Sequence, residues 1–507
     1  MPDRADDGPA GPDRSRRNLV LVALMLTMAL SAMDTTIVAT AVPQIVDSIG
    51  GFSLFTWLFS IYLLTQTVTI PVYGKLADLY GRKAVLCVGI VIFLAGSALS
   101  AAAWSMIALI AFRGLQGLGA GSIQATVQTI AGDLYSLEER GKVQGWLSSV
   151  WGMAAVLGPT LGGVFADYVS WRWIFLVNLP IGAVALWLIV RYLHDRPTGR
   201  AHHVDYLGSA MILLSCGALL FGLLQGGAAW PWLSAPSIAT FVLTFVLIVV
   251  TILVERRARE PVVPGWVWTR RVLAGSNLTY LGVGLLTIGP STFLPTYAQS
   301  VLGLGAVAAG FVLASMSLTW PLASALSHRL YLRIGFRDTG LIGTVLALAA
   351  VAAFPLLAFQ SPVWQPVALT MLLGAGMGLV STPIVVGLQS TVPYRQRGTA
   401  TGSIMFTRYL GQSLGAAIFG AIANSTLRHR LQDAPAHLHG SLPQGIDQVT
   451  PDIVGHRLSP DALNYLQHAM YAATSHVYLA LTVCAVLTLL AVLLVVPRKF
   501  PLLDSPS

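Results

Sequence analysis

The chain has 507 residues, of which 55% are hydrophobic and only 10% are charged, and its mean hydropathy is +0.72. Soluble proteins carry about 25% charged residues, so this composition excludes an ordinary soluble protein. The net charge of +9 would suit a nucleic-acid-binding protein, but the distribution of the basic residues along the chain excludes that function.

Fourteen apolar runs of about twenty residues follow one another along the chain. A transmembrane helix needs about 20 apolar residues, whereas the strands of a membrane barrel alternate over about ten. The runs therefore predict an all-α integral membrane protein with fourteen transmembrane helices. They cover residues 19–42, 54–73, 84–103, 105–130, 141–166, 173–193, 205–227, 236–255, 272–298, 306–328, 339–359, 364–390, 398–422 and 472–496.

The basic residues predict how the chain is oriented. Of the 30 Lys and Arg residues, 24 fall in alternate loops or termini on one side of the predicted spans. Positive loops remain in the cytoplasm, so both termini are expected to be cytoplasmic, with the protein in the plasma membrane. We expect a disordered N-terminus at 1–18, an exterior loop at 423–471 and a cytoplasmic tail at 497–507.

The two halves of the chain are related by an internal repeat. At a shift of 257 residues, EERGKVQG (138–145) lies over RQRGTATG (395–402). At a shift of 254, KLADLYGRK (75–83) lies over RLYLRIGFR (329–337), with Leu332 in the place of Asp78. The repeat predicts six-helix bundles at 19–195 and 272–496, with two extra helices at 205–255 between them. Parallel repeats of this kind are typical of transporters with one central site.

Asp34 is the only one of the 21 acidic residues that lies well inside a predicted span. A charged Asp at a helix centre costs about 2.5 to 3.5 kcal/mol, so its presence indicates a function. A polar group hydrogen-bonded between helices is the alternative. Arg113 lies at a similar depth in the fourth span. The two form either a permanent structural ion pair or one that yields to substrate or proton.

Three further features carry candidate functional residues. The segment between spans two and three holds Gly74, Asp78, Gly81, Arg82 and Lys83, and it predicts a tight hydrophilic turn. Its Asp78 can accept hydrogen bonds from helix N-termini or pair with an Arg in the facing loop, unless the segment is a plain charged turn.

The fifth span contains Gly158, Pro159, Gly162 and Gly163, which permit a kink and close helix packing, or packing alone. Arg408 lies about ten residues inside the run at 398–422. It either meets an anionic substrate group or a carbonyl-lined cavity, or it has a structural role.

Four of these stretches resemble motifs of a known family. Residues 74–83 are similar to the signature loop of the major facilitator superfamily. The segments DTTIV with AVP (34–43), RGLQGLGAG (113–121) and GPTLGG (158–163) are similar to helix motifs of the fourteen-span drug:proton antiporters. The resemblance covers nearly the whole chain, and its motifs occur in the correct order.

The resemblance implies export of small amphipathic or cationic drugs, driven by inward proton movement. Asp34 would exchange a proton for substrate, Arg113 and Gln116 would tune that exchange, and Gly74–Lys83 would latch the cytoplasmic gate. The stretch from Gly158 to Gly163 would shape a rocking helix. We expect a monomer that uses the proton gradient without cofactor or metal.

Two other functions stay open. One is the export of a single endogenous metabolite, lipid or self-made antibiotic. The other is a polytopic sensor or enzyme, which would need a signalling domain or a cluster of metal ligands or nucleophiles. No nucleotide-binding loop or metal-ligand spacing occurs in the sequence, so an enzyme is not expected.

Overall fold

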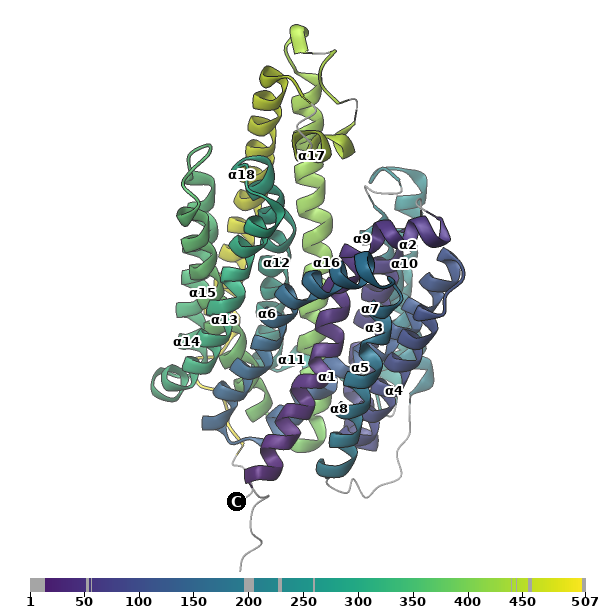
Figure 1. Ribbon diagram of the computed structural model, residues 1–507. Helices are drawn as coiled ribbons and strands as arrows, with labels where there is room; N and C mark the ends of the chain where they lie inside the picture. Colours follow the sequence, from purple (N-terminus) through teal and green to yellow (C-terminus); the bar gives the residue numbers. More distant parts are fainter. Residues whose placement is uncertain are drawn as a thin grey trace, which may run out of the picture.

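The computed structural model describes residues 14–51, 54–55, 57–195, 205–226, 230–258, 260–438, 440–443, 445–454 and 458–503. Within these residues the chain is helical apart from turns, connections and one isolated bridge between Gly226 and Trp230. The predicted all-α class is therefore confirmed. Each of the fourteen predicted runs falls on a helix or on two successive helices, and Figure 1 shows the long helices side by side.

The N-terminal unit contains six long helical stretches. They are α1 (Arg14–Thr40), α3 (Trp57–Tyr80), α4 (Arg82–Ala101), α5 (Met106–Leu134), α6 (Leu137–Tyr168) and α8 (Asn178–Tyr192). Two short helices, α2 (Val42–Ile49) and α7 (Trp173–Leu176), join them. Two more long helices, α9 (Tyr206–Gln225) and α10 (Ala235–Arg257), follow before the second unit. Among the membrane-spanning candidates, α10 is the least buried.

The C-terminal unit repeats the pattern. Its long helices are α12 (Arg271–Ser300), α13 (Ala306–Ile334), α14 (Phe336–Ala353), α15 (Trp364–Ser390), α16 (Tyr394–Gln432) and α18 (Pro460–Leu490). The short helices are α11 (Trp266–Thr269), the 3-10 turns Phe354–Leu356 and Ala436–Leu438, α17 (Ile446–Val454) and a π-turn at Ala491–Val495. In Figure 1 the green and yellow helices of this unit lie mostly on one side and the purple and blue helices on the other.

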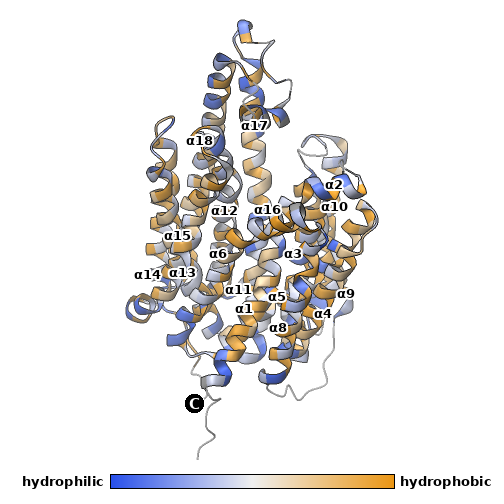
Figure 2. Cartoon of the chain, in the orientation of Figure 1, coloured by the Kyte–Doolittle hydropathy of each residue, from blue (hydrophilic) through white to orange (hydrophobic). Residues whose placement is uncertain are grey.

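Twelve helices of the described residues are long and apolar enough to cross a membrane, so this is a multi-pass membrane protein. The long helices α3 and α16 are not among the twelve. Polar and small residues lower their hydropathy, such as Thr65–Thr69 in α3 and Gly398–Ser403 in α16, and α16 is pale in Figure 2. The two helices pack on each other between the units, where they face protein rather than lipid.

The same helix contact recurs in both units at the spacing of the sequence repeat. A Cβ built on Gly117 of α5 would lie 2.1 Å from Thr65 Oγ1 of α3. A Cβ on Gly374 of α15 would lie 2.3 Å from Thr319 Oγ1 of α13. Gly117 and Gly374 are 257 residues apart, and Thr65 and Thr319 are 254 apart. Small residues thus allow corresponding helices to approach closely in each unit.

Helices extend into segments that the sequence predicted as irregular. Residues 14–18 belong to α1, and between α3 and α4 only Gly81 is non-helical, with φ of 97°. The predicted exterior loop 423–471 holds the end of α16, α17 and the start of α18. Hydropathy marks where apolar surface ends, whereas a helix continues as long as its backbone bonds are made.

The two predicted tails are described only in part. Residues 1–13 and 504–507 lie outside the described residues. The described part of the C-terminal tail packs on the C-terminal unit, since the rings of Phe500 and Phe336 are 5.2 Å apart and Leu503 N donates to Ser390 O at 2.9 Å.

Candidate functional site

A buried ion pair connects α1 to α5. Arg113 donates from Nη1 to Asp34 Oδ2, and Gln116 donates from Nε2 to Asp34 Oδ1 over 2.7 Å. Arg113 Nη1 also donates to Gln116 Oε1 over 2.8 Å. None of the three side chains is more than 1% exposed. The structure thus brings all three residues of the predicted coupling site into one cluster.

Arg113 has contacts beyond the ion pair. Its Nε donates to the backbone oxygen of Leu58 over 3.2 Å, and its guanidinium carbon lies 4.3 Å from the centre of the Tyr62 ring. Breaking a buried ion pair by neutralising one partner typically costs about 3–5 kcal/mol, because the other charge stays buried. The arrangement around Arg113 therefore depends on the charge of Asp34.

Ser31, one turn before Asp34 in α1, contacts further polar side chains. The hydroxyl groups of Ser31 and Tyr62 are 3.2 Å apart, and Ser31 Oγ accepts from Gln66 Nε2 at 3.4 Å and from Gln124 Nε2 at 3.3 Å. These residues were not predicted from the sequence. Their signal was present, because Ser31 shares a helix face with Asp34 and glutamines are rare in apolar spans.

Small residues of α6 hold α1 in place beside Asp34. A Cβ on Gly158 would lie 1.9 Å from Thr36 Oγ1, and one on Gly162 would lie 2.1 Å from Thr40 Oγ1. Thr36 also donates to the backbone oxygen of Ala154 at 3.0 Å. A Cβ on Gly163 would meet nothing within 4 Å. Two of the three glycines in this motif therefore pack α6 against α1, and Gly163 does not.

An apolar cavity of about 240 Å³ lies between α1 and α6. Its walls are residues of α1 from Val22 to Met33 and residues of α6 from Val150 to Leu157. The atoms that line it are entirely apolar. Met33, the chain neighbour of Asp34, lines this cavity, whereas Asp34, Arg113 and Gln116 do not.

Asp78 joins α3 to the second turn of α16. Its Oδ1 accepts from Gly398 N at 2.8 Å, and its Oδ2 accepts from Thr399 N at 2.7 Å and from Thr399 Oγ1 at 2.8 Å. Arg82 Nη2 donates to Oδ1 at 3.0 Å. The predicted bonds to a helix N-terminus lie one turn further in, because Gly398 and Thr399 follow the first turn of α16. The arginine partner comes from the same segment and not from the facing loop.

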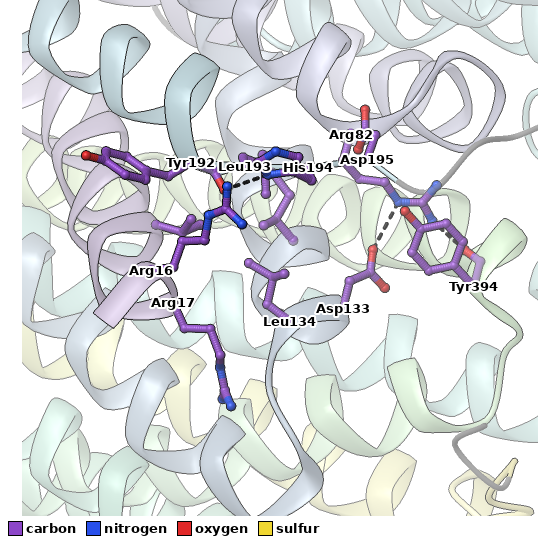
Figure 3. Close-up of a pocket in the computed structure, with 12 residues that line it drawn as sticks. Arg16, Arg17, Arg82, Asp133, Leu134, Tyr192, Leu193, His194, Asp195 and Tyr394 are labelled. Carbon is purple, nitrogen blue, oxygen red and sulfur yellow. Dashed lines mark hydrogen bonds and ion pairs between the residues drawn. The ribbon is translucent and has the colours of Figure 1, made fainter. Parts of the chain in front are cut away.

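Arg82 extends this contact to both units. Its Nε donates to Asp133 Oδ2 at 3.0 Å, its Nη2 donates to Tyr394 O, and its guanidinium lies 3.8 Å from the Tyr394 ring centre. Asp133 also accepts from Arg397 Nη1 at 2.5 Å. Figure 3 shows Arg82 between Asp133 and Tyr394. Asp133 and Arg397 were not predicted, because charged residues at the ends of spans are common.

The same residues line a cavity of about 280 Å³ at the end of the molecule where α1 begins (Figure 1). Arg82, Asp133 and Tyr394 contribute to its wall, together with Arg16 and His194 (Figure 3). The cavity therefore lies where the N-terminal and C-terminal units meet. We call this contact between the units the seam.

Gly74 and Lys83 have different roles from each other. A Cβ on Gly74 would lie 2.6 Å from Gly398 O, so only glycine permits this approach of α3 to α16. Lys83 points to α8, since its Nζ donates to Val190 O at 2.8 Å and its backbone N donates to Asp195. Lys83 therefore anchors α4 within the N-terminal unit and makes no part of the contact with α16.

Other hydrogen bonds hold the two units together at this end. Arg140 Nη1 donates to Ser390 Oγ at 2.9 Å, and Gln389 Nε2 donates to Gln128 O at 3.0 Å. Tyr331 donates its hydroxyl hydrogen to Leu137 O at 2.7 Å. Together with the Asp78 and Asp133 contacts, these bonds close the seam between the units at the end that carries the termini.

Arg408 belongs to α16 of the C-terminal unit. Its guanidinium carbon is 5.5 Å from the centre of the Trp320 ring. Its Nε is buried and has no hydrogen-bond partner in the described part of the chain. The predicted cavity residue is thus a cation beside an aromatic ring.

Comparisons with known proteins support the family that the sequence motifs resemble. The family model described as "Major Facilitator Superfamily" matches residues 24–416. The chain belongs to this superfamily. It is 34% identical over 485 residues to "Multidrug resistance protein 3" of Bacillus subtilis (strain 168), with 94% of both chains covered. It is 32% identical over 475 residues to "Multidrug transporter protein MdtP" of the same organism, covering 92% of this chain and 87% of that protein.

A solved structure shows the same fold at much lower identity. The crystal structure of the human organic anion transporter MFSD10 (TETRAN) matches with a TM-score of 0.62 and 15% identity, and it covers 92% of this chain and 99% of that one. Superfamily membership places the chain among membrane transporters rather than enzymes. Asp34, Arg113 and the seam contacts therefore lie in a transporter fold.

Proposed function

We propose that this superfamily member exports small amphipathic, drug-like compounds and that inward proton movement drives the export. The observation that carries the proposal is the Asp34 carboxylate, which is fully buried and bonded to Arg113 and Gln116. The names of the two Bacillus relatives support drug-like substrates. The apolar cavity beside Met33 supports compounds with substantial apolar surface.

Proton binding at Asp34 would change the conformational preference of the protein. A protonated Asp34 no longer balances the charge of Arg113, which cannot lose its proton. The conformation with an intact ion pair then becomes less favourable than one that rehydrates or re-pairs Arg113. A ligand shifts two conformations only through its different affinity for them, and Asp34 supplies that difference for the proton.

The proposal assigns the closed seam to the cytoplasmic side of the membrane. The positive-inside pattern supports cytoplasmic termini, and the closed seam lies at the end that carries them. In this state Asp34 is inaccessible and both of its oxygens are bonded. Opening the cytoplasmic side requires breaking the bonds of Asp78 and Asp133 to α16.

We also propose that α3 and α16 cross the membrane, which gives fourteen spans. Both are longer than the roughly 20 residues that a bilayer requires. Their polar residues face protein and therefore do not oppose insertion of the folded bundle. The helices α9 and α10 then form an additional pair beside the two six-helix units.

Efflux in proteoliposomes with an imposed pH gradient tests the proposal. We expect the wild-type protein to accumulate rhodamine 6G against its gradient and Asp34→Asn to abolish this accumulation, because Asn cannot bind and release a proton. Asp47→Asn is the matched control, since Asp47 is exposed. Full pH-driven accumulation by Asp34→Asn would refute proton exchange at this residue. Export of one compound and no other would favour a dedicated metabolite exporter.

A further inference from the structure

Arg408 is a membrane-embedded cation whose charge no carboxylate balances within the described residues. Its Nε is buried without a hydrogen-bond partner, and the only ring contact of its guanidinium in the described residues is with Trp320. An arginine remains charged at any physiological pH, and a charged group inside a membrane protein needs a partner or water. Arg408 is partly exposed.

The sequence of the C-terminal unit supplies no acidic partner nearby. Between Glu260 and Asp433 the only acidic residue is Asp338. Asp338 begins α14 at the terminus end and lies 3.6 Å from Arg498. In the N-terminal unit Asp34 is already bonded through both oxygens. Within the described residues no carboxylate is paired with Arg408, so its guanidinium is left to water or to a bound anion.

Aromatic side chains beside Arg408 are held in fixed positions. Tyr280 donates its hydroxyl hydrogen to Ser381 O at 2.7 Å, and Trp320 Nε1 donates to Ser381 Oγ at 3.2 Å. Ser381 of α15 thus fixes Tyr280 of α12 and Trp320 of α13, the ring that Arg408 contacts. Because both ring donors are already used, the guanidinium is the group left to bind an anion.

We propose that Arg408 binds the anionic group, a carboxylate or sulfonate, of an amphipathic substrate whose ring system packs beside Trp320. The proposal rests on the export function above and adds amphipathic anions to its substrates, beside the cations that the sequence predicted. A planar guanidinium suits such oxyanions because it can donate two parallel hydrogen bonds.

In this proposal the N-terminal unit binds the proton and the C-terminal unit binds the substrate anion. At the repeat shift of 257, Arg113 corresponds to Thr370 and Gln116 to Leu373, so the proton-binding cluster has no copy in the C-terminal unit. Conversely, Arg408 corresponds to Trp151, so the N-terminal unit has no copy of the unbalanced cation. A substrate anion at Arg408 and a proton at Asp34 therefore occupy different groups and do not compete for one charge.

Two fluorescent probes with the same rings separate charge recognition from apolar binding. They are 8-anilinonaphthalene-1-sulfonate, an anion, and N-phenyl-1-naphthylamine, which is neutral. The protein is placed in nanodiscs of zwitterionic lipid, and the signal of empty nanodiscs is subtracted. The variants are Arg408→Gln, Arg408→Lys and the control Arg430→Gln, which changes an exposed residue of the same helix.

We expect Arg408→Gln to weaken binding of the sulfonate about tenfold or more, the factor that corresponds to one lost charge-assisted hydrogen bond. The neutral probe should change less than about twofold. Arg408→Lys should restore part of the sulfonate affinity, and Arg430→Gln should leave both probes unaffected. Unchanged sulfonate binding by Arg408→Gln, or equal losses for both probes, would overturn the proposal.

Efflux of both probes under a pH gradient distinguishes this proposal from the export function. If the wild-type protein exports neither these probes nor rhodamine 6G, the export function fails. If Arg408→Gln exports both probes at the wild-type rate, only the anion site is wrong. Loss of sulfonate efflux with normal efflux of the neutral probe supports both proposals.

Discussion

Asp133 binds one arginine from each unit at the same time. Arg82 Nε donates to its Oδ2 at 3.0 Å, and Arg397 Nη1 donates to its Oδ1 at 2.5 Å. The Asp133 side chain is only 9% exposed, so water screens these charges weakly. A single carboxylate therefore keeps two guanidinium groups together across the seam, and the seam can open only when Arg397 leaves it.

Asp133→Asn should weaken the closed seam. The amide keeps the size of the side chain but loses the charge that both arginines need, and it can accept through one oxygen only. A reporter cysteine at Thr401, which is fully buried beside Gln389, should react faster with a maleimide in inside-out vesicles. We expect about a tenfold increase, which corresponds to about 1.4 kcal/mol of lost closed-state preference.

Asp338→Asn is the matched control for this prediction. Asp338 also pairs with an arginine at the terminus end, but Asp338 and Arg498 belong to the same unit. Its replacement should leave the reactivity at position 401 unchanged. If Asp133→Asn and Asp338→Asn give the wild-type labelling rate alike, Asp133 does not hold the units together.

The buried cluster around Asp34 was easier to predict from the sequence than the contacts between the units around Asp133 and Asp78. Asp34 and Arg113 are unusual inside apolar runs, so burial cost alone identified them, and the structure places them in contact. Asp133 and Arg397 lie where charged residues are ordinary, so hydropathy gave no signal. The pairing of Asp78 with Thr399 depends on how two helices distant in sequence are placed, which no local pattern specifies.

Asp78→Asn should reduce transport while the protein still inserts and folds. The neutral side chain keeps one acceptor oxygen, whereas the carboxylate accepts three bonds from Gly398 and Thr399 and one from Arg82. Bonds to charged groups contribute about 1.5–3 kcal/mol each. We expect efflux at matched expression to fall about tenfold or more, a factor that about 1.4 kcal/mol produces. Efflux at the wild-type rate would mean that the segment is only a charged turn.

Gly158→Ala should impair the protein, and Gly163→Ala should not. The new methyl group at position 158 would lie 1.9 Å from Thr36 Oγ1, next to Asp34, whereas at position 163 it meets nothing within 4 Å. Overpacking costs about 1–3 kcal/mol. We expect Gly158→Ala to lower both thermal stability in detergent and efflux. Equal behaviour of the two variants would show that close packing of α6 on α1 does not matter.

A cysteine at Ser441 tests the proposed orientation. Ser441 is exposed and lies between α16 and α18, in the region expected outside the cell. An impermeant thiol reagent should label Ser441→Cys on intact cells. The parent protein is the control for Cys87, Cys216 and Cys484, which are only partly exposed. Labelling only after cell lysis would mean that residue 441 lies inside the cell. The closed seam would then face outward.

Arg113→Lys should uncouple the transporter although it keeps the positive charge. Arg113 uses Nη1 for both Asp34 and Gln116 and Nε for Leu58 O. The single ammonium of lysine lacks the planar fork that makes these bonds together. We therefore expect pH-driven accumulation of rhodamine 6G to fall about tenfold or more, on the basis of at least one lost charge-assisted bond.

Downhill movement of the same dye provides the internal control, because it requires binding and conformational exchange but no proton step. Arg113→Lys should retain most of this movement, which separates loss of coupling from loss of folding. Gln116→Leu removes the bond to Asp34 Oδ1 and leaves the ion pair, so its effect on accumulation should be smaller. If Arg113→Lys accumulates dye as the wild type does, charge alone is sufficient at this position, and the bonding geometry around Asp34 has no part in coupling.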